Sequence, residues 1–282
     1  MSRLDRALRR IIPSTALLSR SAATVPMLAA ADGIARAMLR VFTRQPIPPL
    51  KYIVRTGVGN SIFFPHHYYL TAAYPIWMYL FSRGLASLDS RIVDIGSGVG
   101  KSAVALRDFD YLGQRFQGHY HGFDIDPGMV AWCRENFPAD RFRFTCLDMN
   151  SSVYNPEGSV GNRPRLEYED GGADLVLSQS LFSHLLEDDI RHYLRESRRV
   201  LRPGGVMSMT FFCLDDLERL GLLGGRWTFQ HPLGAALVES SKYPESAVAY
   251  QREWMLGAAR EAGFSSAAVI LPATQSTLEG VR

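Results

Sequence analysis

An acidic residue followed by alternating glycines is the feature of this chain most suited to chemistry. Asp94 stands two residues before Gly96, and further glycines follow at positions 98 and 100. Residues without a Cβ atom let the backbone approach a ligand closely, and a helix that begins after such a turn presents free N–H groups. Because residues 92–95 resemble a short buried strand and residues 101–107 the start of a helix, the stretch predicts a ligand-holding strand–turn–helix.

Three interpretations of this turn compete. A phosphate-binding P-loop has four residues between its first glycine and Gly-Lys-Ser, and here the position that should be glycine holds Ile95, so we reject this interpretation. A dinucleotide turn has the pattern G-x-G-x-x-G, and here the third glycine, Gly100, comes one residue early. The third interpretation is a glycine-rich turn that binds no ligand. The glycine turn alone therefore leaves two possibilities open: it binds a ligand that is not a dinucleotide, or it binds no ligand.

Apolar and amphipathic segments alternate after residue 90, which predicts a parallel sheet with helices on both faces. The predicted strands are residues 91–95, 120–125, 142–147, 173–177, 206–212 and about 267–271. Predicted helices cover residues 127–136, 187–202 and 247–262. The helix over 187–202 has acidic residues in its first turn and arginines in its last, and Pro203-Gly204-Gly205 is expected to end it.

Two further acidic residues stand where predicted strands end. Asp124 closes the strand over 120–125, where a carboxylate can accept hydrogen bonds from ribose hydroxyls, whereas Asp126 is expected to cap the next helix. Asp148 follows the strand over 142–147 and could accept from an adenine amino group, with Met149 packed on the ring. Ligands of open α/β sheets bind at these strand ends. The plainer alternative is that the acids are surface loop residues.

Taken in order, these motifs resemble the class I S-adenosylmethionine (SAM) methyltransferases. The resemblance rests on residues 93–100 (VDIGSGVG), 122–126 (GFDID), 174–178 (DLVLS) and 199–205 (RVLRPGG), and it covers about residues 88–282. It implies a doubly wound, mostly parallel seven-stranded sheet of the Rossmann-like methyltransferase type, with the last strand antiparallel. Residues 1–87 would form a basic, aromatic-rich helical extension, residues 88–282 the methyltransferase domain, and SAM would be the cofactor.

The resemblance also implies roles for single residues. Gly96 and Gly98 would border the methionine end of SAM, Asp124 the ribose and Asp148 the adenine, while Asp94 would help to hold the amine. The full set of predicted cofactor contacts is Asp94, Gly96, Ser97, Gly98, Gly100, Asp124, Ile125, Asp148, Met149 and Ser178.

The acceptor side rests on one segment, residues 178–185 (SQSLFSHL), similar to the Ser-x-Phe-x-His-Leu segment of many bacterial small-molecule and glycan methyltransferases. His184 is the predicted catalytic base, since an imidazole suits proton transfer at neutral pH. Its alternative role, equally open here, is to cap or pack the helix that begins at residue 187. Weaker candidates are His231, the pair His66-His67 and the pair Asp215-Asp216, and for both pairs a solvated loop is the plainer interpretation.

Charge sets the N-terminal segment apart from the rest of the chain. Residues 1–44 hold eight arginines and two acids, whereas the whole chain has a net charge of +3. Such a segment fits best a helical cap on the catalytic domain, with a peripheral helix on an anionic membrane or an organelle transit peptide as the alternatives. Three scattered cysteines favour a reducing compartment, so we expect a cytoplasmic protein, for which peripheral contact of residues 1–44 with a membrane is an open alternative. No stretch is long and apolar enough to predict a membrane span.

The sequence therefore predicts a metal-independent SAM methyltransferase that acts on a hydroxyl of a small molecule, a sugar or a lipid-linked glycan. No His/Cys cluster indicates zinc, and no basic stripe indicates a nucleic-acid substrate. N- or C-methylation of a small molecule is an alternative, as is a SAM-binding regulatory or scaffold protein without turnover. A further rival is an NAD or nucleotide-sugar enzyme. The acceptor and the oligomeric state stay open.

Overall fold

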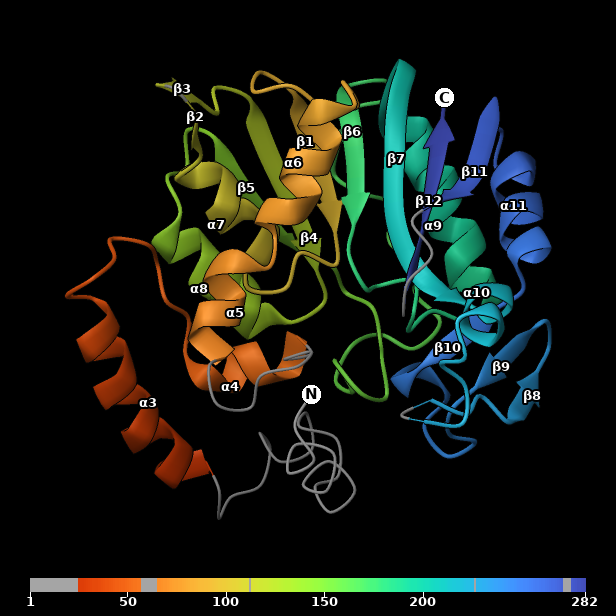
Figure 1. The fold of residues 1–282 in the computed structure, drawn as a ribbon, viewed down its shortest axis with the longest axis horizontal. Coiled ribbons are helices and arrows are strands. Elements are labelled where there is room, and N and C mark those ends of the chain that lie inside the picture. Colours follow the sequence, from red (N-terminus) through yellow and green to blue (C-terminus); the bar gives the residue numbers. More distant parts are fainter. Residues whose placement is uncertain (1–24, 57–64, 112, 226, 271–274) are drawn as a thin grey trace.

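The computed structural model describes the whole chain except residues 1–24, 57–64, 112, 226 and 271–274. Its centre is a sheet in which seven strands lie in the order β5-β4-β1-β6-β7-β12-β11 (Figure 1). These strands are β1 (Arg91–Ile95), β4 (His119–Asp124), β5 (Phe142–Cys146), β6 (Ala173–Ser178), β7 (Leu201–Cys213), β11 (Ser266–Ile270) and β12 (Ser276–Val281). The predicted Rossmann-like methyltransferase architecture is therefore confirmed.

The strand directions bring several strand ends to one edge of the sheet. β1 pairs in parallel with β4 and β6, so that Asp94 lies opposite Gly122 on one side and Leu177 on the other. β5 and β7 continue the parallel part, whereas β12 runs antiparallel to both β7 and β11. The antiparallel last strand agrees with the expectation. Because β1, β4, β5 and β6 are parallel, their carboxyl ends meet at the same edge, where ligands of such sheets bind.

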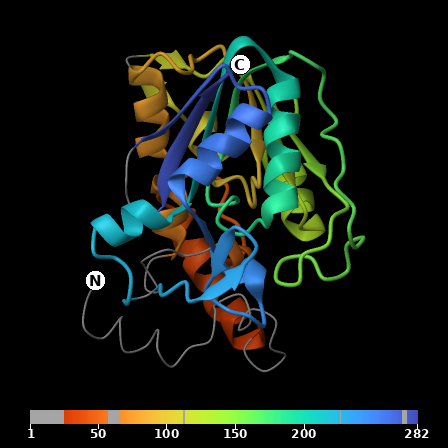
Figure 2. The same cartoon turned by 90° about the vertical axis from the view of Figure 1, so that its right-hand side faces the viewer.

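Helices cover both faces of the sheet. One face carries α5 (Pro65–Thr71), α6 (Tyr74–Ser82), α7 (Lys101–Arg107) and α8 (Pro127–Asn136), and the other carries α9 (Glu187–Val200) and α11 (Arg252–Glu261). The turned view of Figure 2 shows the sheet between these two layers. The alternation of side chains along β1 explains the layers, since Ile92 packs on the first face and Val93 and Ile95 on the second.

The segment before β1 contributes directly to this core. It contains α3 (Val25–Leu39), α4 (Leu50–Ile53), the 3₁₀ turn η1 (Val54–Thr56), α5 and α6. Trp77 of α6 is fully buried and its indole N–H donates to the carbonyl oxygen of Ser102 at 2.9 Å, while the Tyr69 hydroxyl donates to the carbonyl of Val99 at 2.9 Å. The predicted division at residues 87 and 88 stays a prediction, and α5 and α6 share one hydrophobic core with the sheet.

Two predicted helix boundaries are wrong because strand pairing prevails. α9 ends at Val200, and β7 then runs through Pro203-Gly204-Gly205, where β6 has a register shift against it. Residues 248–250, predicted as helix, form β10 (Val248–Tyr250), because this fully buried apolar run lies between β7 and β9. A small sheet thus extends from β7 through β10 to β9 (Ala236–Val238) and β8 (His231–Leu233).

The remaining elements are short. They are β2 (Asp110–Tyr111), β3 (Gln114–Arg115), α10 (Leu214–Arg219) and the 3₁₀ turn η2 (Pro244–Ser246). None of the helices in the described part of the chain has the length and apolar character needed to cross a membrane.

Candidate active site

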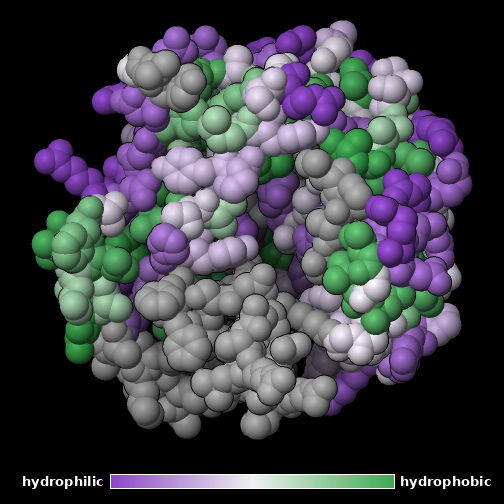
Figure 3. Space-filling model, in the orientation of Figure 1, coloured by the Kyte–Doolittle hydropathy of each residue, from purple (hydrophilic) through white to green (hydrophobic). Residues whose placement is uncertain are grey.

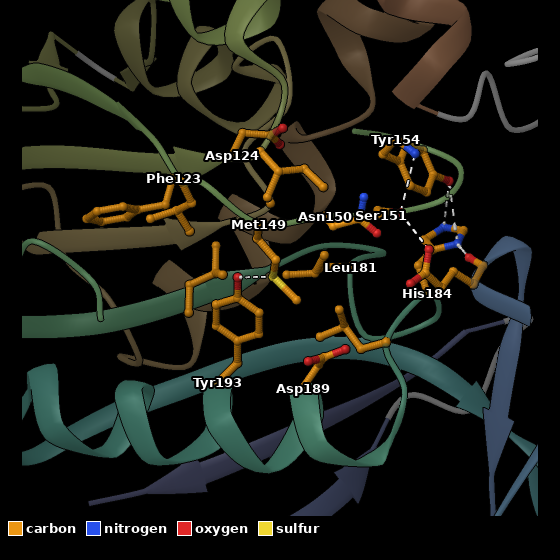
Figure 4. Close-up of a pocket in the computed structure, with 16 residues that line it drawn as sticks. Phe123, Asp124, Met149, Asn150, Ser151, Tyr154, Leu181, His184, Asp189 and Tyr193 are labelled. Atoms are coloured by element: carbon orange, nitrogen blue, oxygen red, sulfur yellow. Dashed lines mark hydrogen bonds between the residues drawn. The ribbon is translucent and has the colours of Figure 1, made fainter. Parts of the chain in front are cut away.

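A cavity lies at the carboxyl edge of the parallel strands. It contains about 520 Å³ of space not filled by atoms, a volume that includes its opening to solvent. Figure 4 shows its lining, which comes from the ends of β1, β4 and β5, the turn after β6, α9 and η2. The lining residues are Ile95, Gly96, Phe123, Asp124, Ile125, Leu147, Met149, Asn150, Ser151, Tyr154, Leu181, His184, Leu185, Asp189, Tyr193 and Glu245.

The glycine turn forms one wall of this cavity, and its backbone conformation explains its composition. Gly96, Gly98 and Gly100 have φ angles of +79°, +54° and +72°, which glycine adopts without the steric cost that other residues meet. The Gly96 and Ser97 amides both donate to the carbonyl oxygen of Phe123, at 2.8 and 3.0 Å. The turn is thereby fixed against the end of β4.

The side chain of Asp124 also fixes the glycine turn in place. One carboxylate oxygen accepts from the Gly98 amide at 2.7 Å, and the other accepts from the Asp126 amide at 2.9 Å. Burial raises the pKa of Asp124, although these backbone donors oppose that effect. Each carboxylate oxygen can accept more than one hydrogen bond, so Asp124 keeps capacity for hydroxyl groups of a ligand in the cavity. Asp126 caps α8 as predicted, accepting from the amides of Gly128 and Met129.

Six predicted cofactor residues lie outside the cavity lining, and five of them belong to the glycine turn or its support. Gly100 packs against α8, since a Cβ atom there would come within 3.0 Å of the Phe137 ring, and the Ser178 hydroxyl donates to the carbonyl of Ile95 at 2.8 Å. Gly98 and Ser97 belong to the turn, and Asp94 is buried behind it, where its carboxylate accepts from the Tyr120 hydroxyl. These residues support the turn from outside the cavity.

Asp148, the sixth, is also turned away from the predicted adenine position. Its carboxylate accepts from the backbone amide of Ser159 at 3.0 Å and from the Ser159 hydroxyl at 2.6 Å, and these bonds lower its pKa. The side chain does not line the cavity, so the arrangement offers no support for the predicted adenine contact. Met149, by contrast, lines the cavity, and the Tyr193 hydroxyl donates to its sulfur at 3.3 Å.

His184 lies in the cavity lining and contacts two residues that sequence reasoning did not single out. Its Nδ1 is 2.9 Å from the backbone carbonyl oxygen of Glu245, which can only accept, so Nδ1 carries the proton. Burial lowers the pKa of His184, so the ring is neutral at neutral pH and its Nε2 has a free lone pair. The Tyr154 hydroxyl is 3.3 Å from Nε2 and 3.4 Å from Nδ1. Figure 4 shows the two side chains facing each other at one end of the cavity.

The hydrogen bonds of His184 bear on the two roles considered for it. The residue that precedes α9 is Leu186, where no side-chain capping hydrogen bond is formed, and the His184 ring hydrogen-bonds to Tyr154 and to the backbone carbonyl of Glu245. A purely structural role of the ring, through packing, stays a prediction. The role of general base stays a prediction, and the neutral ring in the cavity has the protonation state that it requires.

A segment from before β1 closes over the glycine turn. Thr56 of η1 lies so near that a Cβ atom on Gly98 would come within 2.8 Å of its methyl carbon. Arg55, also in η1, connects this segment to two other parts of the site. Its guanidinium is 2.5 Å from the Asp126 carboxylate and donates at 2.7 Å to the backbone carbonyl of Tyr154. Sequence reasoning missed Arg55, because nothing in its neighbourhood resembles a motif.

The weaker candidates lie elsewhere. His231 is exposed on β8, and His66 forms a buried pair with Asp32 at 3.0 Å. The expected solvated loop is wrong for Asp216, which is fully buried and paired with Arg252 and Arg219. None of these side chains lines the cavity.

Comparison with known proteins indicates what kind of domain this is. Residues 93–209 match the sequence profile of a family described as a methyltransferase domain. By sequence, residues 93–209 of this chain therefore resemble a methyltransferase domain. The match includes the glycine turn and the strands whose ends form the cavity, and SAM is the cofactor of the class I methyltransferases that these motifs resemble.

Individual relatives are distant. Phosphoethanolamine N-methyltransferase of Plasmodium falciparum is 22% identical over 130 residues, which are 46% of this chain and 42% of the relative. This chain spans less than half the length of that methyltransferase. An O-methyltransferase family protein from Burkholderia thailandensis matches with a TM-score of 0.52 and 17% identity over 76% of this chain and 57% of its own. The PH0226 protein from Pyrococcus horikoshii matches with a TM-score of 0.51 and 19% identity, over 79% of this chain and 92% of its own.

The residues present fit a sulfonium nucleoside. The cavity has an acidic residue, Asp124, at the end of β4, whose carboxylate oxygens each accept one backbone hydrogen bond and can accept another from a ligand hydroxyl. Apolar side chains such as Leu147 and Met149 line the cavity beyond it. A cavity with one polar wall and one apolar wall can take a ribose and a purine ring.

Proposed function

We propose that this chain transfers a methyl group from SAM to a hydroxyl of a small molecule, a sugar or a lipid-linked glycan, without a metal ion. One observation carries the proposal: a neutral His184, with its free Nε2 beside the Tyr154 hydroxyl, lies in the same cavity as the glycine turn and Asp124. When bound, SAM supplies an electrophilic methyl group on a sulfonium.

The protein's own residues have three tasks in this proposal. Gly96 and Asp124 hold the cofactor, and the apolar lining around it excludes water from the site. His184 accepts the proton that the acceptor hydroxyl loses, a contribution worth about 10²–10⁴ in rate.

Tyr154 can relay that proton from the acceptor hydroxyl to His184. Burial raises the pKa of Tyr154 to about 12, so its hydroxyl is protonated at neutral pH. The hydroxyl can donate its hydrogen to Nε2 of His184 while its oxygen receives the proton of the acceptor, which leaves Tyr154 unchanged and His184 protonated.

A second candidate function is N-methylation of a small amine. Two acidic side chains, Asp189 and Glu245, line the cavity near His184 and could attract a cationic acceptor, and one relative is an N-methyltransferase by name. However, Asp189 already pairs with Arg163 at 2.6 Å, and the Glu245 carboxylate accepts from Ser151 and Ser152. Both carboxylates therefore have protein partners, which favours the hydroxyl acceptor.

The test is turnover with a panel of acceptors. Purified protein is incubated with SAM carrying a labelled methyl group, and with polyols, sugars, phenols and primary amines in turn, with and without a chelator. Label in an oxygen-linked product, unaffected by the chelator and lost in His184→Ala, supports the proposal. Labelled amines would favour the second candidate, and SAM binding without S-adenosylhomocysteine from any acceptor would favour a scaffold protein.

A further inference from the structure

Helix α3 exposes an apolar face on the outside of the molecule. Ile34 and Met38 of α3 are 66% and 64% exposed, and Val41 and Phe42, in the turn that follows the helix, are 78% and 85% exposed. We call these four residues the α3 apolar face. The spacing of four residues places Ile34 and Met38 on one side of the helix. Figure 3 shows this face as an apolar patch at the edge of the molecule, and in Figure 1 α3 stands out from the body of the fold.

Among residues 32–39, the part of α3 whose side chains are described, the polarity is the reverse of that of an ordinary surface helix, whose apolar side faces the protein. Asp32 is only 4% exposed, and its carboxylate is 3.0 Å from Nε2 of His66 in α5, which is also buried. The same carboxylate forms an ion pair with Arg36 at 3.0 Å. A buried polar contact thus holds α3 against the fold and leaves its apolar side in water, an arrangement that marks an interaction surface.

The charges around the α3 apolar face are of one sign. Arg40 and Arg44 are exposed beside it and form no ion pair with any residue that the structure describes. Between Asp32 and Asp89 the sequence has no acidic residue at all. Exposed apolar side chains flanked by unpaired arginines complement an anionic lipid surface, where the apolar groups enter the interface and the arginines meet the headgroups.

We propose that the α3 apolar face docks this protein onto an anionic membrane. Phe42, Val41 and Met38 would enter the boundary between headgroups and acyl chains, and Arg40 and Arg44 would lie against the lipid phosphates. This inference is independent of the proposed methyl transfer, because membrane binding is measured without an acceptor or turnover. The sequence indicated only that the basic segment of residues 1–44 could contact a membrane, and the proposal assigns that contact to the α3 apolar face.

The experiment measures binding of the full-length protein to lipid vesicles by flotation. Vesicles of phosphatidylcholine are compared with vesicles that also contain phosphatidylglycerol. Phe42→Ser is matched with Val160→Ser, because Val160 is equally exposed, at 86%, in a loop outside α3. Arg40→Gln is matched with Arg195→Gln, since Arg195 is exposed on α9, on the other face of the sheet. All four sites are exposed, so the variants should fold, as circular dichroism would check.

We expect the protein to bind only the vesicles with phosphatidylglycerol, and more weakly as salt is added. Phe42→Ser should lower the partition coefficient about tenfold or more, and Arg40→Gln about fivefold, whereas the two control variants should bind as the unaltered protein does. Because residues 1–24 contain five further arginines, unchanged binding of both α3 variants would overturn the proposal and assign the membrane contact to that segment. Absence of binding, or a dimer that Phe42→Ser dissociates, would also overturn it.

Discussion

Asp94, at the end of β1, is a buried carboxyl group with a measurable consequence for stability. It is 2% exposed, and burial raises its pKa from 3.8 to about 7, although hydrogen bonds from Tyr120 and Ser102 oppose this. The folded protein therefore holds this proton at pH values where the unfolded chain has released it. Asp94 contributes stability that is complete below its unfolded pKa and is lost as pH rises through about 7.

The variant Asp94→Asn removes this titration and keeps the side chain's shape. Between pH 5 and pH 8, the unaltered protein should lose roughly 2–3 kcal/mol of unfolding free energy relative to the variant. Urea unfolding of both proteins at the two pH values, without SAM, measures the difference. Since all other groups are shared, an equal pH dependence of the two proteins would show that Asp94 is ionised in the fold.

His184 should control turnover without controlling cofactor affinity. His184→Ala should lower kcat by about 10²–10⁴, because the proton then has no acceptor, while the dissociation constant of SAM changes little. Burial lowers the pKa of His184 below 6.5, so the base is neutral over a wider range and kcat should decline only below pH 6.5. Tyr154→Phe should also lower kcat, since it removes the hydroxyl beside Nε2. A loss of SAM affinity in His184→Ala, measured by calorimetry, would instead assign the residue to cofactor binding.

Four residues predicted to contact the cofactor lie in the cavity lining, and they share one property. Gly96, Asp124, Ile125 and Met149 stand at or just after the ends of strands in a parallel sheet, so their location depends on short-range patterns alone. Tyr154 and Glu245 could not be found in this way, because they come from distant loops that meet only in the folded chain. Asp148 lies outside the cavity lining for a related reason: Ser159, eleven residues later in the chain, donates a hydrogen bond to its carboxylate.

At the scale of elements, the contact between η1 and the methyltransferase domain predicts a role for Arg55. Arg55→Ala should speed SAM dissociation and weaken its affinity by roughly tenfold, since the guanidinium holds the segment that covers the glycine turn. Stability should also fall by about 3 kcal/mol, because the buried Asp126 loses its partner. Stopped-flow measurement of SAM release tests this, with exposed Lys51→Ala in the adjacent α4 as control. Equal release rates in both variants would contradict it.

The ends of helices and strands show which features of the fold short sequence patterns can predict. β1 and α8 have the predicted bounds, the latter because Asp126 and Pro127 begin a helix by capping and by fixed backbone angle. The boundary between α9 and β7 was mispredicted because Pro203-Gly204-Gly205 is typical of a turn, yet Leu201 is already paired with Ala173 of β6. Long-range pairing, which no local pattern encodes, decided that boundary.

At the scale of the whole molecule, a ligand that binds in the cavity should raise the free energy of unfolding. The cavity joins the ends of three strands, α9, η2 and the turn after β6, so a ligand held there contacts elements that unfolding would separate. A ligand that binds only the folded state adds about 2.7 kcal/mol at a hundred times its dissociation constant. For a chain of this size, that corresponds to a rise in Tm of roughly 5–10 °C.

SAM should therefore raise Tm by that amount, and NAD should not, because the glycine turn departs from the dinucleotide spacing at Gly100. Asp124→Asn should reduce the rise, since a carboxylate that accepts from ligand hydroxyls becomes an amide, while Asp148→Asn should leave it intact because that side chain lies outside the cavity lining. Differential scanning fluorimetry of the three proteins with each ligand makes the comparison. A rise with NAD but not with SAM would contradict the assigned cofactor, and loss of the rise in Asp148→Asn would restore the adenine contact that the sequence predicted.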